Sequence, residues 1–419
     1  MRKSIVALFA TGAAGLLLAG CGGGRGATNA ASGGGDGGKE LRVVIAEYSK
    51  DHTKTFWDAF AKKYEARTGV RLNLQIVSWN SIDQQTSTMI QNGDPPDILN
   101  LNAYAGYAKD GLLYNSEEVL PATTKADLID AFVESGTYNG KMYGFPDLSS
   151  ARAMFYNKDL FRRAGISAPP KTWDEFVSDA QKITALGDGT VGYAEPLGPE
   201  EAQAEFSIWA VNNGGAWKTD GKWSINSSKN IETLQFLKDL STKHKVTQNN
   251  PGKTNRTDGA FALFSSGKAG MVIGLSQLST GLDKEERVDY GVAPMPTRDG
   301  GVPQTYGVTD YLMAFKKNGN QDAVKKFYEL YYQPDQVNTW IKAEGFLPVT
   351  ESGLKIFASD PALKVYLDTL PNIHLTPTDD PAWDKVKLAV QQQIGAAVAP
   401  EGNPAAVLDE LQKTAETSG

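Results

Sequence analysis

The chain has 419 residues, 41% of them hydrophobic, and a formal net charge of −7 at pH 7. At roughly 100–200 residues per domain, this length predicts two lobes or domains with enough apolar material for a core. The acidic balance and the lack of clustered Lys and Arg argue against a nucleic-acid partner, because phosphate-binding surfaces need such clusters.

The N-terminal segment predicts export from the cytoplasm. Arg2 and Lys3 precede an apolar run over 5–18, which is too short to span a membrane, so 1–20 is predicted to be a secretory signal peptide. Cys21 is the only cysteine, which excludes a disulfide within one chain. Leu18-Ala19-Gly20-Cys21 resembles the bacterial lipoprotein box, in which the cysteine becomes lipid-modified. The alternative is a plain signal peptide with an incidental cysteine.

The next segment, 22–38, consists mostly of Gly with Ala, Ser and Asn. Such a composition buries too little apolar surface to fold and behaves as a flexible coil. We therefore predict that 21–40 forms a lipid anchor and tether. It would hold the folded body at the outer face of the bacterial cell membrane. No later stretch of about 18 apolar residues follows in the sequence.

The folded body begins with an alternation of strands and helices. The periodicity predicts strands over 41–46, 70–77 and 97–101, with helices over 55–68 and 81–92 between them. This order favours an α/β fold with a largely parallel sheet covered by helices. Ligands of such sheets bind beyond the carboxyl ends of the strands. That rule points to Glu47, Tyr48 and the segment 102–104.

Several short stretches follow one another in an informative order. They are 140–146 (GKMYGFP), 154–166 (MFYNKDLFRRAGI), 169–176 (PPKTWDEF), 264–271 (FSSGKAGM), 290–296 (YGVAPMP), 313–317 (MAFKK) and 345–349 (GFLPV). Together they resemble the substrate-binding lipoproteins of bacterial ABC sugar importers, the maltose- and trehalose-binding kind. Each stretch also has a local structural role: Thr172 with Glu175 predicts a capping box, and Gly267 and Gly345 predict helix ends.

The resemblance implies a two-lobed, type II periplasmic-binding-protein-like fold with the ligand in a cleft between lobes joined by a multi-strand hinge. The first lobe would comprise 41–150 and 317–360, and the second 151–316 and 361–419. The chain would cross between them near 147–154, 312–317 and Asp360. The resemblance further implies a monomer without cofactor or metal, a carbohydrate ligand, and the permease of an ABC importer as partner.

The family pattern also implies ligand contacts in the first lobe and at the first crossing. Glu47 and Tyr48 follow the first strand, although Glu47 could instead cap the next helix. Asn102 holds the place of an acidic or amide residue of the family, and Tyr104 lies just beyond it. At the crossing, Ser150 stands where relatives carry a carboxylate, so Asp147 is predicted to supply the charge. Arg152 is uncommon there, and an Asp147–Arg152 salt bridge at the hinge is the alternative.

Further contacts are implied from the second lobe and the second crossing. Glu195 precedes a proline as in maltose-binding proteins, and Gln277 lies where those relatives use an aromatic ring. Asp310 and Tyr311 occupy the second crossing. Tyr311 and Trp383 are predicted to stack on the sugar, because its C–H faces pack on aromatic rings.

The sequence contains few of the motifs that are typical of enzymes. The segment 187–192 matches G-x-G-x-x-G in spacing but follows a predicted helix, the reverse of the dinucleotide context, so it is predicted to be a loop. Three histidines leave little material for a triad or zinc site. The adjacent acids 200–201, 285–286 and 379–380 are predicted to lie at the surface. A binding protein for a polyamine or phosphate ester, or a secreted carbohydrate-active enzyme, remains an alternative function.

Overall fold

The computed structural model describes residues 40–79 and 81–418. The predicted signal peptide, Cys21 and the tether up to residue 39 lie outside the described residues. Within the described part of the chain, no helix combines the length and apolarity needed to cross a membrane.

The first sheet has five strands in the order β2-β1-β3-β14-β6. Its strands are β1 (Glu40–Glu47), β2 (Arg71–Ser78), β3 (Ile98–Leu101), β6 (Phe145–Ser149) and β14 (Thr309–Ala314). β1 pairs in parallel with β2 and β3, as predicted, whereas β14 pairs antiparallel with both β3 and β6. The sheet is therefore mixed rather than largely parallel. We call the part of the molecule built on it the first lobe.

Both faces of the first sheet are buried at β1, which explains the continuous apolar run of this strand. Val43 and Ile45 belong to a core shared with Trp57 of α1, while Val44 on the opposite face packs in a second cluster with Met313. The helices in the sequence segments of this lobe are α1 (Thr53–Thr68), α2 (Ile82–Gln91), α3 (Ala105–Lys109), α4 (Ser116–Val119), α5 (Ala122–Asp127), α6 (Asp130–Ser135), α13 (Gln321–Tyr331), α14 (Pro334–Glu344) and α15 (Glu351–Phe357).

The second sheet has four strands in the order β12-β7-β11-β8 and defines the second lobe. Its strands are β7 (Ala153–Asn157), β8 (Val191–Tyr193), β11 (Ala269–Gly274) and β12 (Tyr290–Ala293). β7 is antiparallel to both of its neighbours, and β11 is parallel to β8. The remaining strands form pairs: β4 (Thr137–Tyr138) with β5 (Lys141–Met142), β9 (Lys218–Thr219) with β10 (Lys222–Trp223), and β13 (Thr305–Gly307) with β15 (Ile373–Leu375).

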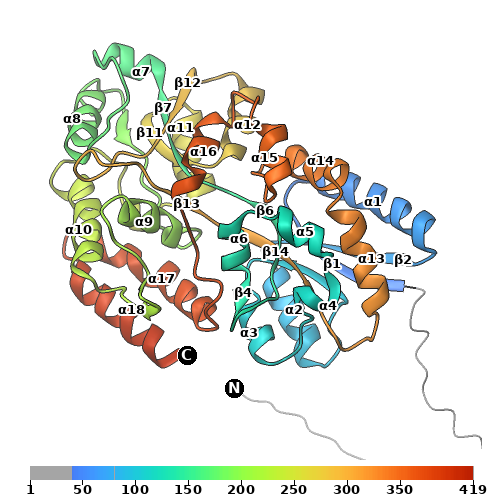
Figure 1. Cartoon of the computed structure of the whole chain (residues 1–419). Coiled ribbons are helices and arrows are strands. Elements are labelled where there is room, and N and C mark those ends of the chain that lie inside the picture. Colours follow the sequence, from blue (N-terminus) through green and yellow to red (C-terminus); the bar gives the residue numbers. More distant parts are fainter. Residues whose placement is uncertain (1–39, 80, 419) are drawn as a thin grey trace, which may run out of the picture. The chain divides into compact units, whose positions relative to one another are not determined.

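The last two helices pack on the second lobe, as predicted. α17 (Trp383–Ala397) contacts α9 (Ala202–Val211), and α18 (Pro404–Ser418) contacts α10 (Ser228–Thr242), as the red and green helices of Figure 1 show. Val386, Val390 and Ile394 are fully buried at the helical spacing that predicted them. The other helices of the later segments are α7 (Lys158–Arg163), α8 (Trp173–Thr184), α11 (Ala262–Ser265), α12 (Ser276–Glu285) and α16 (Lys364–Thr369), with short turns η1 (Pro251–Lys253), η2 (Arg256–Phe261) and η3 (Leu370–Asn372).

The predicted helix ends are largely confirmed. Gly69 follows α1 with φ 73° and Gly345 follows α14 with φ 72°, the left-handed conformation that glycine adopts without steric cost. The Thr172 side chain accepts a hydrogen bond from the Glu175 backbone N–H at 3.2 Å. The Glu175 carboxylate accepts from Lys171 N instead of Thr172 N, so this cap differs from the predicted reciprocal box.

Two chain crossings between the sheets lie side by side. β6 ends at Ser149 and β7 begins at Ala153, while Val308 alone separates β13 from β14. The Ser150 N–H donates to the Val308 carbonyl at 3.0 Å, which ties the crossings together. β14 lies between β3 and β6 in the first sheet, so the chain has entered that sheet by Thr309, before the predicted crossing at 312–317. The predicted boundary at residue 316 comes after that strand, and the third crossing near Asp360 stays a prediction.

Candidate functional site

A buried carboxylate marks the end of the first lobe at the first crossing. Asp147 on β6 is fully buried and accepts hydrogen bonds from Asn100 Nδ2 at 2.9 Å and Trp340 Nε1 at 3.2 Å. The Tyr331 hydroxyl donates to it as well. Burial raises the pKa of Asp147 to about 7, although the hydrogen bond from Tyr331 opposes the shift. Asp147 makes no salt bridge with Arg152, so that alternative is not the arrangement in the structure.

A second buried carboxylate lies on the neighbouring strand. Asp310 on β14 pairs with Leu148 of β6, and its Oδ2 lies 2.8 Å from the Tyr48 hydroxyl. That hydroxyl is also 3.1 Å from Asn100 Oδ1, so Tyr48 and Asn100 connect the two carboxylates. Burial raises the pKa of Asp310 to about 7, while the Tyr48 hydrogen bond and the positive charge of Lys387 oppose the shift. We call Tyr48, Asn100, Asp147 and Asp310 the carboxylate cluster.

Aromatic rings surround Tyr48 edge to face. Its ring centroid lies 5.4 Å from that of Trp79, 5.6 Å from that of Trp340 and 5.3 Å from that of Phe346. Trp79 is half-buried and directly follows β2. It is a candidate contact that the sequence analysis missed, although the strand-end rule that selected Glu47 and Tyr48 applies equally to Trp79.

The start of α1 fixes the backbone of Tyr48. Thr53 Oγ1 accepts from the Tyr48 N–H and the Ser49 N–H at 3.0 Å each, and it donates to Glu344 Oε1 at 2.6 Å. Glu47 does not cap α1, which excludes that alternative. Glu47 and Asn102 are half-buried and make no side-chain hydrogen bond to another residue in the described ranges.

On the side of the second lobe, two arginines share one carboxylate. Arg152 Nη2 donates to Glu201 Oε2 at 2.9 Å, and Arg256 Nη1 donates to the same oxygen. Arg256 Nη2 also lies 3.4 Å from Glu200 Oε1. Burial alone would raise the pKa of Glu201, but the charges of Arg256 and Arg152 outweigh it and the pKa lies below its ordinary value. The prediction that 200–201 is a solvated surface pair is therefore wrong for Glu201, whose side chain is 26% exposed.

Polar atoms without partners border this arginine network. Among the described residues, the buried atoms without a hydrogen-bond partner include Arg256 Nε itself, Asn255 Oδ1 next to it in the chain, and Gln203 Oε1 two residues after Glu201. Glu195 Oε1 and Oε2 and Gln277 Oε1 are also unpartnered. A cavity of about 10 Å³, lined in part by Arg152, Glu201 and Arg256, has room for about one water molecule. Buried polar groups normally find partners, so this concentration is typical of a site that is completed by water or a ligand. Burial raises the pKa of Glu195 well above its ordinary value.

Both rings predicted to stack on the sugar, Tyr311 and Trp383, are packed inside the protein, and so is Tyr104. Tyr311 is 1% exposed, lies 5.2 Å from the Tyr104 ring, and its hydroxyl is 2.6 Å from Ser135 Oγ and 3.0 Å from Thr378 Oγ1. Trp383 is 3% exposed and packs in the core of the second lobe. Neither ring offers a free face in this structure, so the stacking role of both stays a prediction. Ser150, at the crossing, is also buried.

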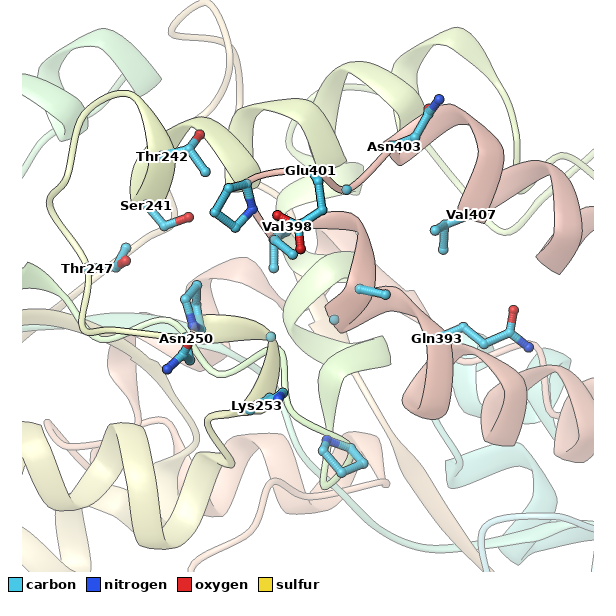
Figure 2. Close-up of a pocket in the computed structure, with 18 of the residues that line it drawn as sticks. Ser241, Thr242, Thr247, Asn250, Lys253, Gln393, Val398, Glu401, Asn403 and Val407 are labelled. Atoms are coloured by element: carbon cyan, nitrogen blue, oxygen red, sulfur yellow. The ribbon is translucent and has the colours of Figure 1, made fainter.

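A large cavity lies elsewhere in the second lobe. It measures about 1440 Å³ and is formed by the segment around η1 and by α17 and α18, with mainly polar side chains at its wall (Figure 2). The labelled residues include Thr242, Asn250, Gln393 and Asn403. None of the twelve ligand contacts predicted from the sequence lines this cavity. Volume alone therefore does not locate the site, and the crossing between the lobes remains its best candidate position.

Known proteins are similar to this chain in sequence. Residues 48–338 match the model of the family described as bacterial extracellular solute-binding protein. A Brucella abortus protein named only as a binding protein is 30% identical over 388 residues, covering 90% of this chain and 92% of its own. The diacetylchitobiose binding protein DasA of Streptomyces coelicolor is 27% identical, covering 84% of this chain and 83% of its own.

A solved structure has the same architecture. The ABC transporter solute binding protein of Thermotoga lettingae, bound with α-D-tagatose, superposes with a TM-score of 0.77 at 22% identity. The match covers 90% of this chain and 99% of that one, which confirms the two-lobed periplasmic-binding-protein fold. The chain belongs to the bacterial extracellular solute-binding protein family.

Proposed function

We propose that the chain captures a carbohydrate outside the cell and delivers it to the membrane permease of an ABC importer. The observation that carries the proposal is the pair of buried carboxyl groups, Asp147 and Asp310, that Tyr48 and Asn100 connect beside the crossings of the two lobes. Sugar hydroxyls both donate and accept hydrogen bonds, so a sugar can satisfy such groups. Membership of a solute-binding family and the name of the Streptomyces relative support this assignment.

The proposed contacts come from both lobes. Asp310 and Tyr48 would form hydrogen bonds with hydroxyls of the ligand. The half-buried ring of Trp79 would pack against a C–H face of the sugar. The other proposed contacts of the first lobe are Glu47, Asn102, Tyr104, Asp147, Ser150 and Tyr311. Those of the second lobe are Arg152, Glu195, Gln277 and Trp383. Closure of the lobes about the crossings would bring the two sets against one ligand.

A carbohydrate is expected to stabilise and compact the protein. A ligand that binds only the native state adds about 2.7 kcal/mol to the free energy of unfolding at a hundredfold excess over Kd, so a thermal-shift screen of neutral sugars should identify it. The sugar that scores should also reduce the radius of gyration in small-angle scattering, because closure brings the lobes together. Asp310→Ala should weaken binding by about 1–3 kcal/mol, because a buried hydroxyl loses its partner.

The matched control is Asp289→Ala, which changes an exposed carboxylate that directly precedes β12 of the second lobe and pairs with Lys158. It should leave the affinity unchanged. If spermidine or a phosphate ester raises the melting temperature and no sugar does, the proposed carbohydrate ligand is contradicted.

We further propose that the protein is anchored to the membrane by lipid on Cys21. Support comes from the segment Leu18-Ala19-Gly20-Cys21 and the Gly-rich stretch that follows it. Mass spectrometry of protein from native membranes should then show a diacylglyceryl-modified cysteine at the N-terminus. Cys21→Ser is expected to release the protein in soluble form, and an unmodified wild-type N-terminus would contradict the anchor.

A further inference from the structure

We propose that Glu201 sets the charge class of the ligand by occupying both arginines of the candidate site. With these guanidinium groups already neutralised, the site takes neutral sugars and rejects sugar phosphates and sugar acids. The inference rests on the proposed function, because it assumes that the ligand is a carbohydrate bound at this site. It adds a specificity-determining residue and a subclass of ligand.

The geometry shows that Glu201 holds the position of an anionic ligand. Arg152 is 5% exposed, so its charge needs a counter-ion within the protein. Its Nη2 donates to Glu201 Oε2 at 2.9 Å, and Arg256 approaches the same oxygen from the η2 segment. Two guanidinium groups around one carboxylate oxygen reproduce the way arginines hold a phosphate or a ligand carboxylate.

Glu201 is also held in place. It directly precedes α9, the helix that carries the unpartnered Gln203. Its neighbour Glu200 accepts from the Thr257 N–H at 2.9 Å and contacts Arg256, so two adjacent carboxylates bind one short segment. The pair 200–201 and the arginines 152 and 256 thus form a charge-balanced set in which neither guanidinium group is left for an anion.

The remaining charges of the site are unfavourable for an anion. Asp147, Asp310, Glu195 and Glu205 are buried, and within residues 40–79 and 81–418 none of them makes a salt bridge with Lys or Arg. A phosphate or carboxylate entering here would face these acids without a free arginine. Neutral hydroxyls can donate to the same acids, whatever their protonation state.

Glu201→Gln tests the inference, because it keeps the size of the side chain and removes its charge. Arg152 then lacks its counter-ion, and inorganic phosphate should bind about tenfold or more tightly than to the wild type, since charge-assisted bonds are the strong ones. Relative to glucose, glucose 6-phosphate should also bind more tightly to Glu201→Gln than to the wild type. Isothermal titration and the phosphate-dependent rise of the melting temperature measure both effects.

The matched control is Glu232→Gln, which changes a carboxylate of the same lobe that pairs with Arg298 on the surface. It should gain no phosphate affinity. The double variant Arg152→Gln, Glu201→Gln removes both charges of the buried pair and should fold without phosphate and bind none. Should Glu201→Gln unfold in the absence of anions, phosphate is expected to restore its folding.

Three results would overturn the inference. The wild type could already bind phosphate as tightly as Glu201→Gln, or the folded variant could show no gain in phosphate affinity. The third is an unfolded variant whose folding phosphate does not restore. These results are independent of the sugar screen. If no sugar binds the wild type but Glu201→Gln gains phosphate affinity, the carbohydrate assignment fails while the role of Glu201 stands. If sugars bind the wild type but Glu201→Gln gains no phosphate affinity, the carbohydrate assignment stands and the role proposed for Glu201 fails.

Discussion

Replacing Trp383 with Ala is expected to lower the free energy of unfolding of the ligand-free protein by about 3–5 kcal/mol, the cost typical of deleting a large buried ring. The ring is 3% exposed and its centroid lies 5.6 Å from that of Trp217 and 6.4 Å from that of Trp223. Its removal leaves a cavity in the core of the second lobe, because close-packed neighbours relax only partly. Urea denaturation of the apo protein measures the loss.

Trp79→Ala is the matched comparison, because the same deletion is made at a half-buried ring beside Tyr48. It should cost less stability and weaken sugar binding by an amount on the order of 1–3 kcal/mol, by analogy with aromatic anchors at interfaces. If Trp383→Ala instead leaves the apo protein stable and abolishes binding, Trp383 is a stacking residue as the family resemblance implies. The position of the cleft would then have to include the start of α17.

Stability should fall as the pH rises from about 4 to about 7, because the folded state holds buried carboxyl groups with raised pKa values, Asp147 and Asp310 among them. Asp147 and Asp310 each have a pKa of about 7, raised from 3.8 by burial. Below pH 4 both groups are protonated in the folded and unfolded states. Between pH 4 and 7 the unfolded chain loses these protons while the folded chain keeps them. Each group therefore costs about 1.4 kcal/mol per pH unit, or about 4 kcal/mol at pH 7.

Asp310→Asn isolates one of these groups. Its amide oxygen can still accept from the Tyr48 hydroxyl, which lies 2.8 Å from Asp310 Oδ2, but the side chain no longer titrates. The variant should lose part of the decline between pH 4 and 7, as measured by the urea midpoint at each pH. Asp289→Asn, at an exposed carboxylate, should keep the wild-type profile. An Asp310→Asn profile identical to that of the wild type would show that burial does not raise the pKa of Asp310.

Local periodicity and turn chemistry carried much of the fold prediction. The strand and helix pattern from β1 to β3 and the apolar face of α17 were correct, because each depends on residues within a few positions of one another. The placement of β14 was not. Thr309–Ala314 pairs with β3 and β6, which lie more than 150 residues away in the chain. The sequence of the strand itself does not predict these partners. The second crossing therefore lies earlier than predicted.

For the candidate site, sequence patterns alone placed Tyr48 after the first strand and Asp147 and Asp310 at the crossings, and the structure brings these three side chains into one hydrogen-bonded cluster with Asn100. Their role as ligand contacts stays a prediction. What each side chain contacts depends on long-range packing that no local pattern encodes. Burial of Tyr311 and Trp383 depends on rings brought from distant segments, and Glu201 became the partner of Arg152 across 49 positions. Adjacent acids such as 200–201 look solvated in a sequence, because the charge that pairs with one of them arrives through long-range folding.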